Sequence, residues 1–160
     1  MKPSHTLKVT TPSDREIMIT RDFDAPRELV FEAYTRPELL KRWFIGPPDW
    51  ELAVCDIDLR VGGEYRYLWR APDGMEMGMR GTFREVVVPE RLVSTERFDQ
   101  AWYPGDAVGT VTFVDQGERT TVTITVVYES REARDIALQS GMEQGVSMNF
   151  DRLEALLRRN

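Results

Sequence analysis

The sequence predicts a single α+β domain, in which an antiparallel sheet of about seven strands packs against a long C-terminal helix. Three observations predict this class. Short segments in the middle of the chain alternate apolar and polar residues between turns that contain Gly or Pro, which is typical of strands in hairpin order. Two segments that begin near a proline follow the first strand and predict short helices. Near the C-terminus, the apolar residues recur at helical spacing.

The elements follow in order along the chain. Residues 15–23 alternate and predict the first strand. Asp24-Ala25-Pro26 begins a helix through Tyr34, and Arg36-Pro37-Glu38 begins a second through Trp43, because Pro is favoured in the first turn. Six further strands are predicted between turn signals, at 50–59, 64–70, 77–88, 91–99, 107–114 and 119–128.

The last thirty residues predict the covering helix. Ser130 is suited to cap a helix start after the final strand. From Met142 onward, one helical face carries Met142, Val146, Phe150, Leu153 and Leu157. A single polar side chain, Asn149, interrupts this stripe. A long helix whose apolar face rests on a curved sheet can enclose a cavity.

Alternation also predicts which side of each strand faces this helix. The inner positions are Tyr65, Tyr67, Trp69, Met77, Met79, Gly81, Phe83, Leu92, Ser94, Glu96, Phe98, Val111, Phe113, Val122, Ile124, Val126 and Tyr128. The opposite faces carry arginines and threonines, which suit solvent. The sheet is therefore expected to be covered on one side only.

Composition excludes several classes of function. The formal net charge is -6 and the pI is about 4.9, which argues against nucleic acid or an anionic membrane as a partner. No segment is apolar enough for a membrane span. The single cysteine, Cys55, cannot form an internal disulfide, so a cytoplasmic location is expected. Residues 1–14 are predicted to be a flexible tail, and residues 15–160 the single domain.

The inventory of reactive side chains is also restrictive. The only histidine, His5, falls in the predicted tail, so a Ser-His-Asp or Cys-His mechanism lacks its base. No metal site is expected, because the chain lacks the His and Cys ligands of zinc. Neither glycine-rich phosphate-binding motif occurs, and no cofactor is expected.

Several short motifs carry a family resemblance. They are Arg42-Trp43-Phe44 with Gly46-Pro47, Cys55 to Arg60 with Gly62-Gly63, Pro72-Asp73-Gly74, Gly81 to Val86 with Pro89 to Leu92, Tyr128-Glu129-Ser130, Ser140-Gly141-Met142 and Arg152-Leu153. In this order and spacing, the chain resembles the bacterial homologues of the activator of heat-shock protein 90 ATPase, in the SRPBCC (START-like) superfamily. The resemblance implies a helix-grip fold with a pocket between the sheet and the C-terminal helix, and a possible role in the stress response.

The sequence departs from this family at two positions. Val146 stands where the family often carries an aromatic residue, commonly Trp. Ile45 separates Trp43-Phe44 from Gly46, where the family often reads Trp-Trp-Gly-Pro. Both positions would shape the pocket, so the ligand of a relative does not transfer to this chain.

The candidate ligand-binding residues are inward-facing aromatic, methionine and polar side chains. They are Trp43, Trp69, Met77, Met79, Phe83, Glu96, Phe98, Trp102, Phe113, Met142, Val146 and Asn149. Glu96 and Asn149 need partners if buried, so they either orient a ligand or bond to each other, an arginine or water. No catalytic residue is assigned. Asp56, Asp58 and Arg60 are expected to form a surface network.

Three functions are compatible with these observations. The first is a binding protein for a small apolar or amphipathic ligand, as a monomer or homodimer. The second is a co-chaperone-like domain with a chaperone as its partner. The third is a metal-independent cyclase, lyase or hydrolase that uses a pocket carboxylate and amide. We expect the chain not to be an enzyme, because it lacks nucleophilic machinery.

Overall fold

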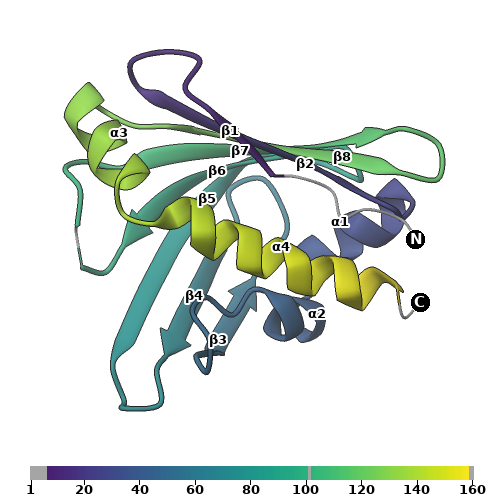
Figure 1. Ribbon diagram of the computed structural model, residues 1–160, viewed down its shortest axis with the longest axis horizontal. Helices are drawn as coiled ribbons and strands as arrows, with labels where there is room; N and C mark the ends of the chain where they lie inside the picture. The colour runs from purple at the N-terminus through teal and green to yellow at the C-terminus, as the bar shows by residue number, and fades with distance from the viewer. Residues whose placement is uncertain (1–6, 101, 159–160) are drawn as a thin grey trace.

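A computed structural model describes residues 7–100 and 102–158, in which one curved antiparallel sheet bends around a long helix (Figure 1). The strands are β1 (Lys8–Thr10), β2 (Glu16–Phe23), β3 (Glu51–Ile57), β4 (Glu64–Arg70), β5 (Glu76–Val87), β6 (Arg91–Phe98), β7 (Ala107–Asp115) and β8 (Thr120–Val127). The helices are α1 (Arg27–Thr35), α2 (Pro37–Trp43), α3 (Arg131–Leu138) and α4 (Met142–Arg158).

The sheet is continuous, with strand order β1-β2-β8-β7-β6-β5-β4-β3. Every neighbouring pair is antiparallel. Helix α4 lies across its concave side, and α1 and α2 close one end (Figure 1). The predicted α+β class is confirmed.

Two sequence-based expectations are corrected. Residues 8–10, which were expected in a flexible tail, form β1 and pair with residues 18–20 of β2. The sheet therefore has eight strands rather than seven, because β2 offers an edge that a short polar segment can cover. Residues 1–6 of that tail, His5 included, lie outside the described part of the chain.

The C-terminal segment contains two helices where a single long final helix was predicted. The Ser130 hydroxyl accepts the Ala133 backbone N–H at 3.1 Å, which confirms it as the cap of α3. Gly141 then adopts φ 86°, a left-handed conformation that other residues rarely reach, and α4 starts in a new direction at Met142.

The C-terminal half of α4 forms the core with the sheet. Phe150 and Leu153 are buried, and the Phe150 ring meets Phe23 edge to face at 5.3 Å. Arg21 of β2 is also buried, and its guanidinium contacts Asp151 at 2.8 Å and Glu154 at 3.5 Å. These contacts fix the position of the helix over the sheet.

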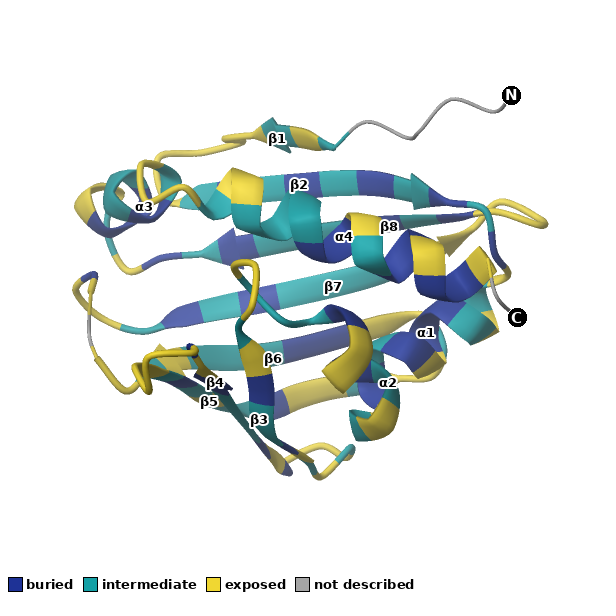
Figure 2. Cartoon of the chain, turned by 60° about the horizontal axis from the view of Figure 1, so that its bottom comes forward, coloured by how far each residue is buried: buried dark blue, intermediate teal, exposed yellow. Residues whose placement is uncertain are grey.

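The N-terminal half of α4 is packed less closely. Met142 and Val146 are only half-buried, although both belong to the apolar stripe. In Figure 2, α4 is exposed or intermediate near α3, and buried residues appear only toward its C-terminal end, where they alternate with exposed ones. The two halves therefore differ: one half completes the core, and the other stands over a more accessible part of the sheet.

Candidate functional site

Glu96 of β6 is the one inward-facing carboxylate in the middle of the sheet among the described residues. No hydrogen bond or ion pair from another described residue reaches it. Burial raises the pKa of its carboxyl from 4.5 to about 7. The side chain nevertheless keeps intermediate solvent exposure. Glu96 therefore combines an apolar environment, an open approach and unused hydrogen-bonding capacity.

Small residues on the two neighbouring strands lie next to Glu96. Ala107 of β7 lies opposite it in register, and Gly109 is the next inward position on β7. A Cβ atom at Gly109 would collide with the Glu96 carboxylate. On the other side, a Cβ atom at Gly81 of β5 would collide with the Tyr65 ring and the Thr95 carbonyl. These positions leave room for the carboxylate and for the aromatic rings around it.

All five tyrosines of the chain lie within electrostatic range of Glu96. Burial raises the pKa of each phenol, and the negative charge of Glu96 raises it further. They come from α1, β4, the loop after β6 and the end of β8: Tyr34, Tyr65, Tyr67, Tyr103 and Tyr128. We call Glu96 and these tyrosines the Glu96 site.

The tyrosines form two aromatic groups. On one side, the Tyr65 and Tyr67 rings are 4.9 Å apart, and Tyr67 also contacts Phe44 at 5.3 Å. On the other side, the Tyr103 and Tyr128 rings meet edge to face at 5.2 Å. Glu96 raises the pKa of members of both groups, so it lies near both of them.

Most of the tyrosine hydroxyls are free to bind a further group. Tyr65 donates to the Thr95 carbonyl at 2.7 Å. Four hydroxyls make no hydrogen bond to a described residue: those of Tyr34, Tyr67, Tyr103 and Tyr128. None of these four oxygens is among the fully buried side-chain atoms that lack a hydrogen-bond partner. The Glu96 site therefore offers phenol oxygens as well as a carboxylate.

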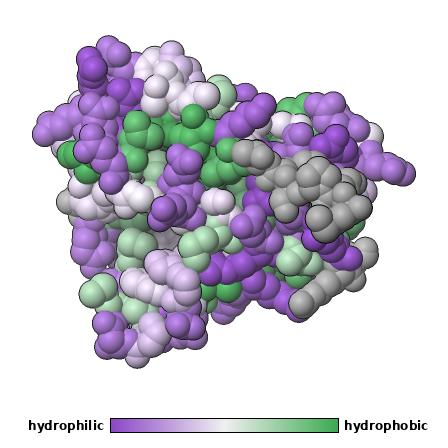
Figure 3. All heavy atoms as spheres, viewed as in Figure 1, coloured by the Kyte–Doolittle hydropathy of each residue, from purple (hydrophilic) through white to green (hydrophobic). Residues whose placement is uncertain are grey.

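Half-buried apolar side chains continue the inner surface beside this site. They are Met77, Met79, Phe98, Val111, Ile124, Met142 and Val146. In the orientation of Figure 1, a small group of hydrophobic residues reaches the surface above α4, among hydrophilic ones (Figure 3). The inner surface is thus amphipathic, with an apolar area next to polar oxygens.

The structure divides the predicted binding residues into groups. Four belong to the core: Trp43, Trp69, Phe83 and Phe113 are buried. The two tryptophans of this group donate to backbone carbonyls: the Trp43 indole to Ala33 at 2.9 Å, and the Trp69 indole to Phe44 at 3.0 Å. Six are half-buried, namely Glu96, Met77, Met79, Phe98, Met142 and Val146.

Trp102 and Asn149 have other positions. Trp102 is 38% exposed and packs on Phe98 and Tyr103 at the molecular surface. The Asn149 oxygen accepts from the backbone N–H groups of Ile45 and Gly46 at 3.2 and 3.0 Å, and from Arg152 at 2.9 Å. Asn149 therefore holds the loop after α2 to α4, so its amide has the structural role that was the alternative to ligand binding.

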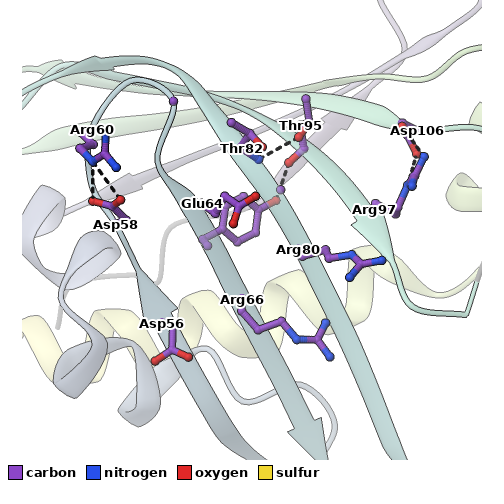
Figure 4. A pocket seen from close by; sticks show the side chains of 13 residues that line it. Asp56, Asp58, Arg60, Glu64, Arg66, Arg80, Thr82, Thr95, Arg97 and Asp106 are labelled. Atoms are coloured by element: carbon purple, nitrogen blue, oxygen red, sulfur yellow. Dashed lines mark hydrogen bonds and ion pairs between the residues drawn. The ribbon is translucent and has the colours of Figure 1, made fainter.

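The outer face of the sheet carries a separate polar groove of about 910 Å³ (Figure 4). Four of its charged side chains pair with one another: Arg60 bonds Asp58 at 2.9 Å, and Arg97 bonds Asp106 at 2.8 Å. Of the expected surface network, the pair of Asp58 and Arg60 is present, and no bond to another described residue joins Asp56 to it. A paired, exposed surface of this kind is typical of a solvated face.

The described residues contain no group of three or more potential metal-ligating side chains that could hold an ion. Cys55 is buried, and burial raises the pKa of its thiol to about 11, so it is not an activated nucleophile. In the part of the chain that the structure covers, no helix has the length and apolarity to cross a membrane.

Sequence reasoning found Glu96 but missed most of its surroundings. The alternation of β4 placed Tyr65 and Tyr67 inside without assigning them to the site. Tyr34 and Tyr103 come from a helix and a loop, for which no periodic signal indicates proximity to β6. An enrichment of small residues at inward positions, such as Gly81 and Gly109, was the available signal for space around Glu96.

A curved antiparallel sheet that bends around a long C-terminal helix, with an accessible inner surface between them, defines a helix-grip protein. Residues 24–158 match the family described as Activator of Hsp90 ATPase homolog 1-like protein, and the chain belongs to this family. The family resemblance and the helix-grip fold that the sequence indicated are both confirmed.

Solved structures share the fold over nearly the whole chain. A protein from Rhodobacter sphaeroides is 25% identical, with a TM-score of 0.91, covering 96% of this chain and 99% of its own. A protein from Mycobacterium smegmatis is 28% identical, with a TM-score of 0.84 and coverages of 97% and 98%. An AHSA1-like protein from Aeromonas hydrophila is 25% identical, with a TM-score of 0.69 and coverages of 87% and 93%. Comparison with curated protein sequences found no significant match.

Proposed function

We propose that this protein binds a small amphipathic molecule on the inner surface between the sheet and the N-terminal half of α4. The family and the fold support a ligand-binding or co-chaperone-like domain in general. The observation that carries the finer proposal is the Glu96 carboxylate, which has no partner among the described residues. Burial of such a group is costly, and proteins retain such costs at functional sites.

The surroundings of Glu96 fit the two ends of an amphipathic ligand. Free phenol oxygens and the carboxylate can take the polar end. Half-buried side chains such as Met79, Val111 and Val146 can take the apolar end, because binding removes their remaining exposed surface from water. The co-chaperone-like alternative would use an outer surface such as the outer groove, where two ion pairs already engage four of the charged side chains.

The proposal is tested with the neutral fluorescent probe N-phenyl-1-naphthylamine, whose emission increases in apolar sites. We expect enhancement with the natural chain. The variant Val146→Trp should abolish it, because a large ring at this half-buried position fills the space under α4. The matched control is Gln144→Trp, which places the same ring on an exposed position of the same helix.

The outcome depends on the comparison of the two variants. Loss of probe binding in Val146→Trp alone, with both variants retaining a cooperative melt, supports the inner site. Equal binding by the natural chain and both variants would place the probe elsewhere and contradict the proposal. Absence of probe binding to the natural chain would contradict it as well.

A further inference from the structure

The ionised Glu96 carboxylate has no positively charged side chain of the described residues beside it. Burial alone accounts for the raised pKa of its carboxyl, with no contribution from a lysine, arginine or histidine of the described chain. The ionisable groups whose pKa Glu96 affects are the five phenols of the Glu96 site, which are neutral and would become negative rather than positive on ionisation. Within the described residues, the site lacks a counter-ion.

The buried arginines of the molecule are occupied elsewhere. Arg21 contacts Asp151 and Glu154 of α4. Arg134 is bound to Asp135 and to the Ser13 carbonyl, each at 2.8 Å. Since these contacts commit both guanidinium groups, rearrangement of either toward Glu96 would break an existing ion pair.

The walls of the site also favour a cation. The face of an aromatic ring carries partial negative charge, so stacked and edge-to-face tyrosines attract ammonium groups, most strongly where water is excluded. Tyr65 and Tyr67 form one wall, and Tyr103 and Tyr128 form the other. Their oxygens can accept hydrogen bonds from an N–H donor, since phenols accept as well as donate.

We propose that the polar end of the ligand is an ammonium group, so that the chain binds an organic amine with an apolar or aromatic body. This inference rests on the proposed function and specifies its ligand class. The ammonium would form an ion pair with Glu96, whose carboxylate lies against Gly109, between the two tyrosine walls. The apolar body would lie toward Val146 and α4.

The test compares three molecules with the same ring: 1-naphthylmethylamine, 1-naphthylmethanol and 1-naphthoic acid. Binding is measured by calorimetry at about pH 8, where a carboxyl with a pKa of about 7 is ionised. We expect the amine to bind about tenfold more tightly than the alcohol, and the acid to bind more weakly than both. The amine affinity should fall as the pH drops below about 7 and Glu96 becomes protonated.

Two variants assign the preference to Glu96. Glu96→Gln should remove the advantage of the amine and leave the alcohol affinity unchanged within about twofold. The control Glu64→Gln makes the same change on an exposed carboxylate of the outer face, and the amine preference should persist.

The results separate this inference from the proposed function. If alcohol and amine bind equally and Val146→Trp abolishes both, the inner site exists and the ammonium inference is wrong. Tightest binding of the acid would also overturn it. If none of the three compounds binds and N-phenyl-1-naphthylamine also fails to bind, both the inference and the proposed function are wrong.

Discussion

Among single residues, Glu96 and Asn149 illustrate how similar polar positions acquire different roles. Both are inward-facing polar side chains in otherwise apolar surroundings. The Asn149 oxygen receives three donors, two of them from the loop after α2. Glu96 receives none from the described residues. A satisfied polar group specifies structure, whereas an unsatisfied one keeps its capacity for a ligand.

The first prediction concerns the pH dependence of stability. The carboxyl of Glu96 has a raised pKa, so the folded state binds a proton more strongly than the unfolded state. The natural chain should therefore lose stability relative to Glu96→Gln as the pH rises from about 4.5 to about 7, with no further change above. The difference should reach on the order of 2 kcal/mol, since one pKa unit corresponds to about 1.4 kcal/mol and the side chain keeps some contact with solvent.

This difference is measured by urea denaturation at a series of pH values, without added ligand. The control Glu64→Gln should show a constant offset from the natural chain across the same range, because Glu64 is exposed. A constant offset for Glu96→Gln as well would mean that its carboxyl is not buried in the folded state.

The second prediction concerns Asn149. Asn149→Leu should destabilise the chain by about 1–3 kcal/mol, because it leaves the N–H groups of Ile45 and Gly46 without their acceptor. Asn149→Asp should cost less, since it keeps an acceptor oxygen beside Arg152. Denaturation midpoints measure both. If Asn149→Leu is as stable as the natural chain but binds N-phenyl-1-naphthylamine more weakly, Asn149 belongs to the ligand site and the structural assignment is wrong.

Among the elements, α4 has two halves that differ in burial. Its C-terminal half contributes Phe150, Leu153, Leu156 and Leu157 to the core. Its N-terminal half begins after the left-handed Gly141 and leaves Met142 and Val146 half-buried. The helix is thus anchored at one end and covers an accessible inner surface at the other.

The third prediction tests this anchor. Leu153 is fully buried, so Leu153→Ala should remove packed methyl groups and cost about 2–5 kcal/mol of unfolding free energy. Gln144→Ala, on an exposed face of the same helix, should stay within about 0.5 kcal/mol of the natural chain. Thermal and urea denaturation compare the two. Equal midpoints would show that the assigned face of the helix is wrong.

Arg152 is not a suitable control for this experiment. It lies off the apolar stripe, yet its guanidinium donates to the Gly46 carbonyl and to the Asn149 oxygen, each at 2.9 Å. Position on a helical wheel does not reveal the Gly46 carbonyl as a partner, because it lies in a loop about a hundred residues away in the sequence.

For the whole molecule, the sheet separates two chemically different surfaces. The concave surface holds the Glu96 site and faces α4, and the convex surface holds the polar groove (Figures 1 and 4). On the convex side, the Arg66 guanidinium holds the pKa of the Asp99 carboxyl below its usual value through a hydrogen bond of 2.6 Å. Glu96 and the Arg66–Asp99 ion pair are separated because successive side chains of a strand point to opposite faces of the sheet.

The fourth prediction follows from this separation. Asp99→Asn breaks a partly exposed ion pair, so it should cost about 1 kcal/mol or less and leave N-phenyl-1-naphthylamine binding unchanged. Gly109→Ala on the inner face should weaken probe binding, because its Cβ would displace the Glu96 carboxylate. Loss of binding in Asp99→Asn with an intact melt would instead place the ligand site on the outer face.

The sequence by itself determined the elements, the strand faces and the family. Period-two alternation, prolines at helix starts and a helical stripe are local signals, and they placed β4 at 64–70 and put Glu96 on the inner side. The short strand β1 was not predicted, because its pairing with β2, rather than its own composition, makes it a strand.

The tertiary structure alone decided which side chains meet. Tyrosines from positions as distant as 34 and 128 act on the same carboxylate, and no local pattern encodes that proximity. It also decided that Asn149 binds a loop and that Glu96 lacks a counter-ion among the described residues. The physical reason is that partners and burial are set by non-local packing, when a sheet curves around a helix and brings separate elements to one place.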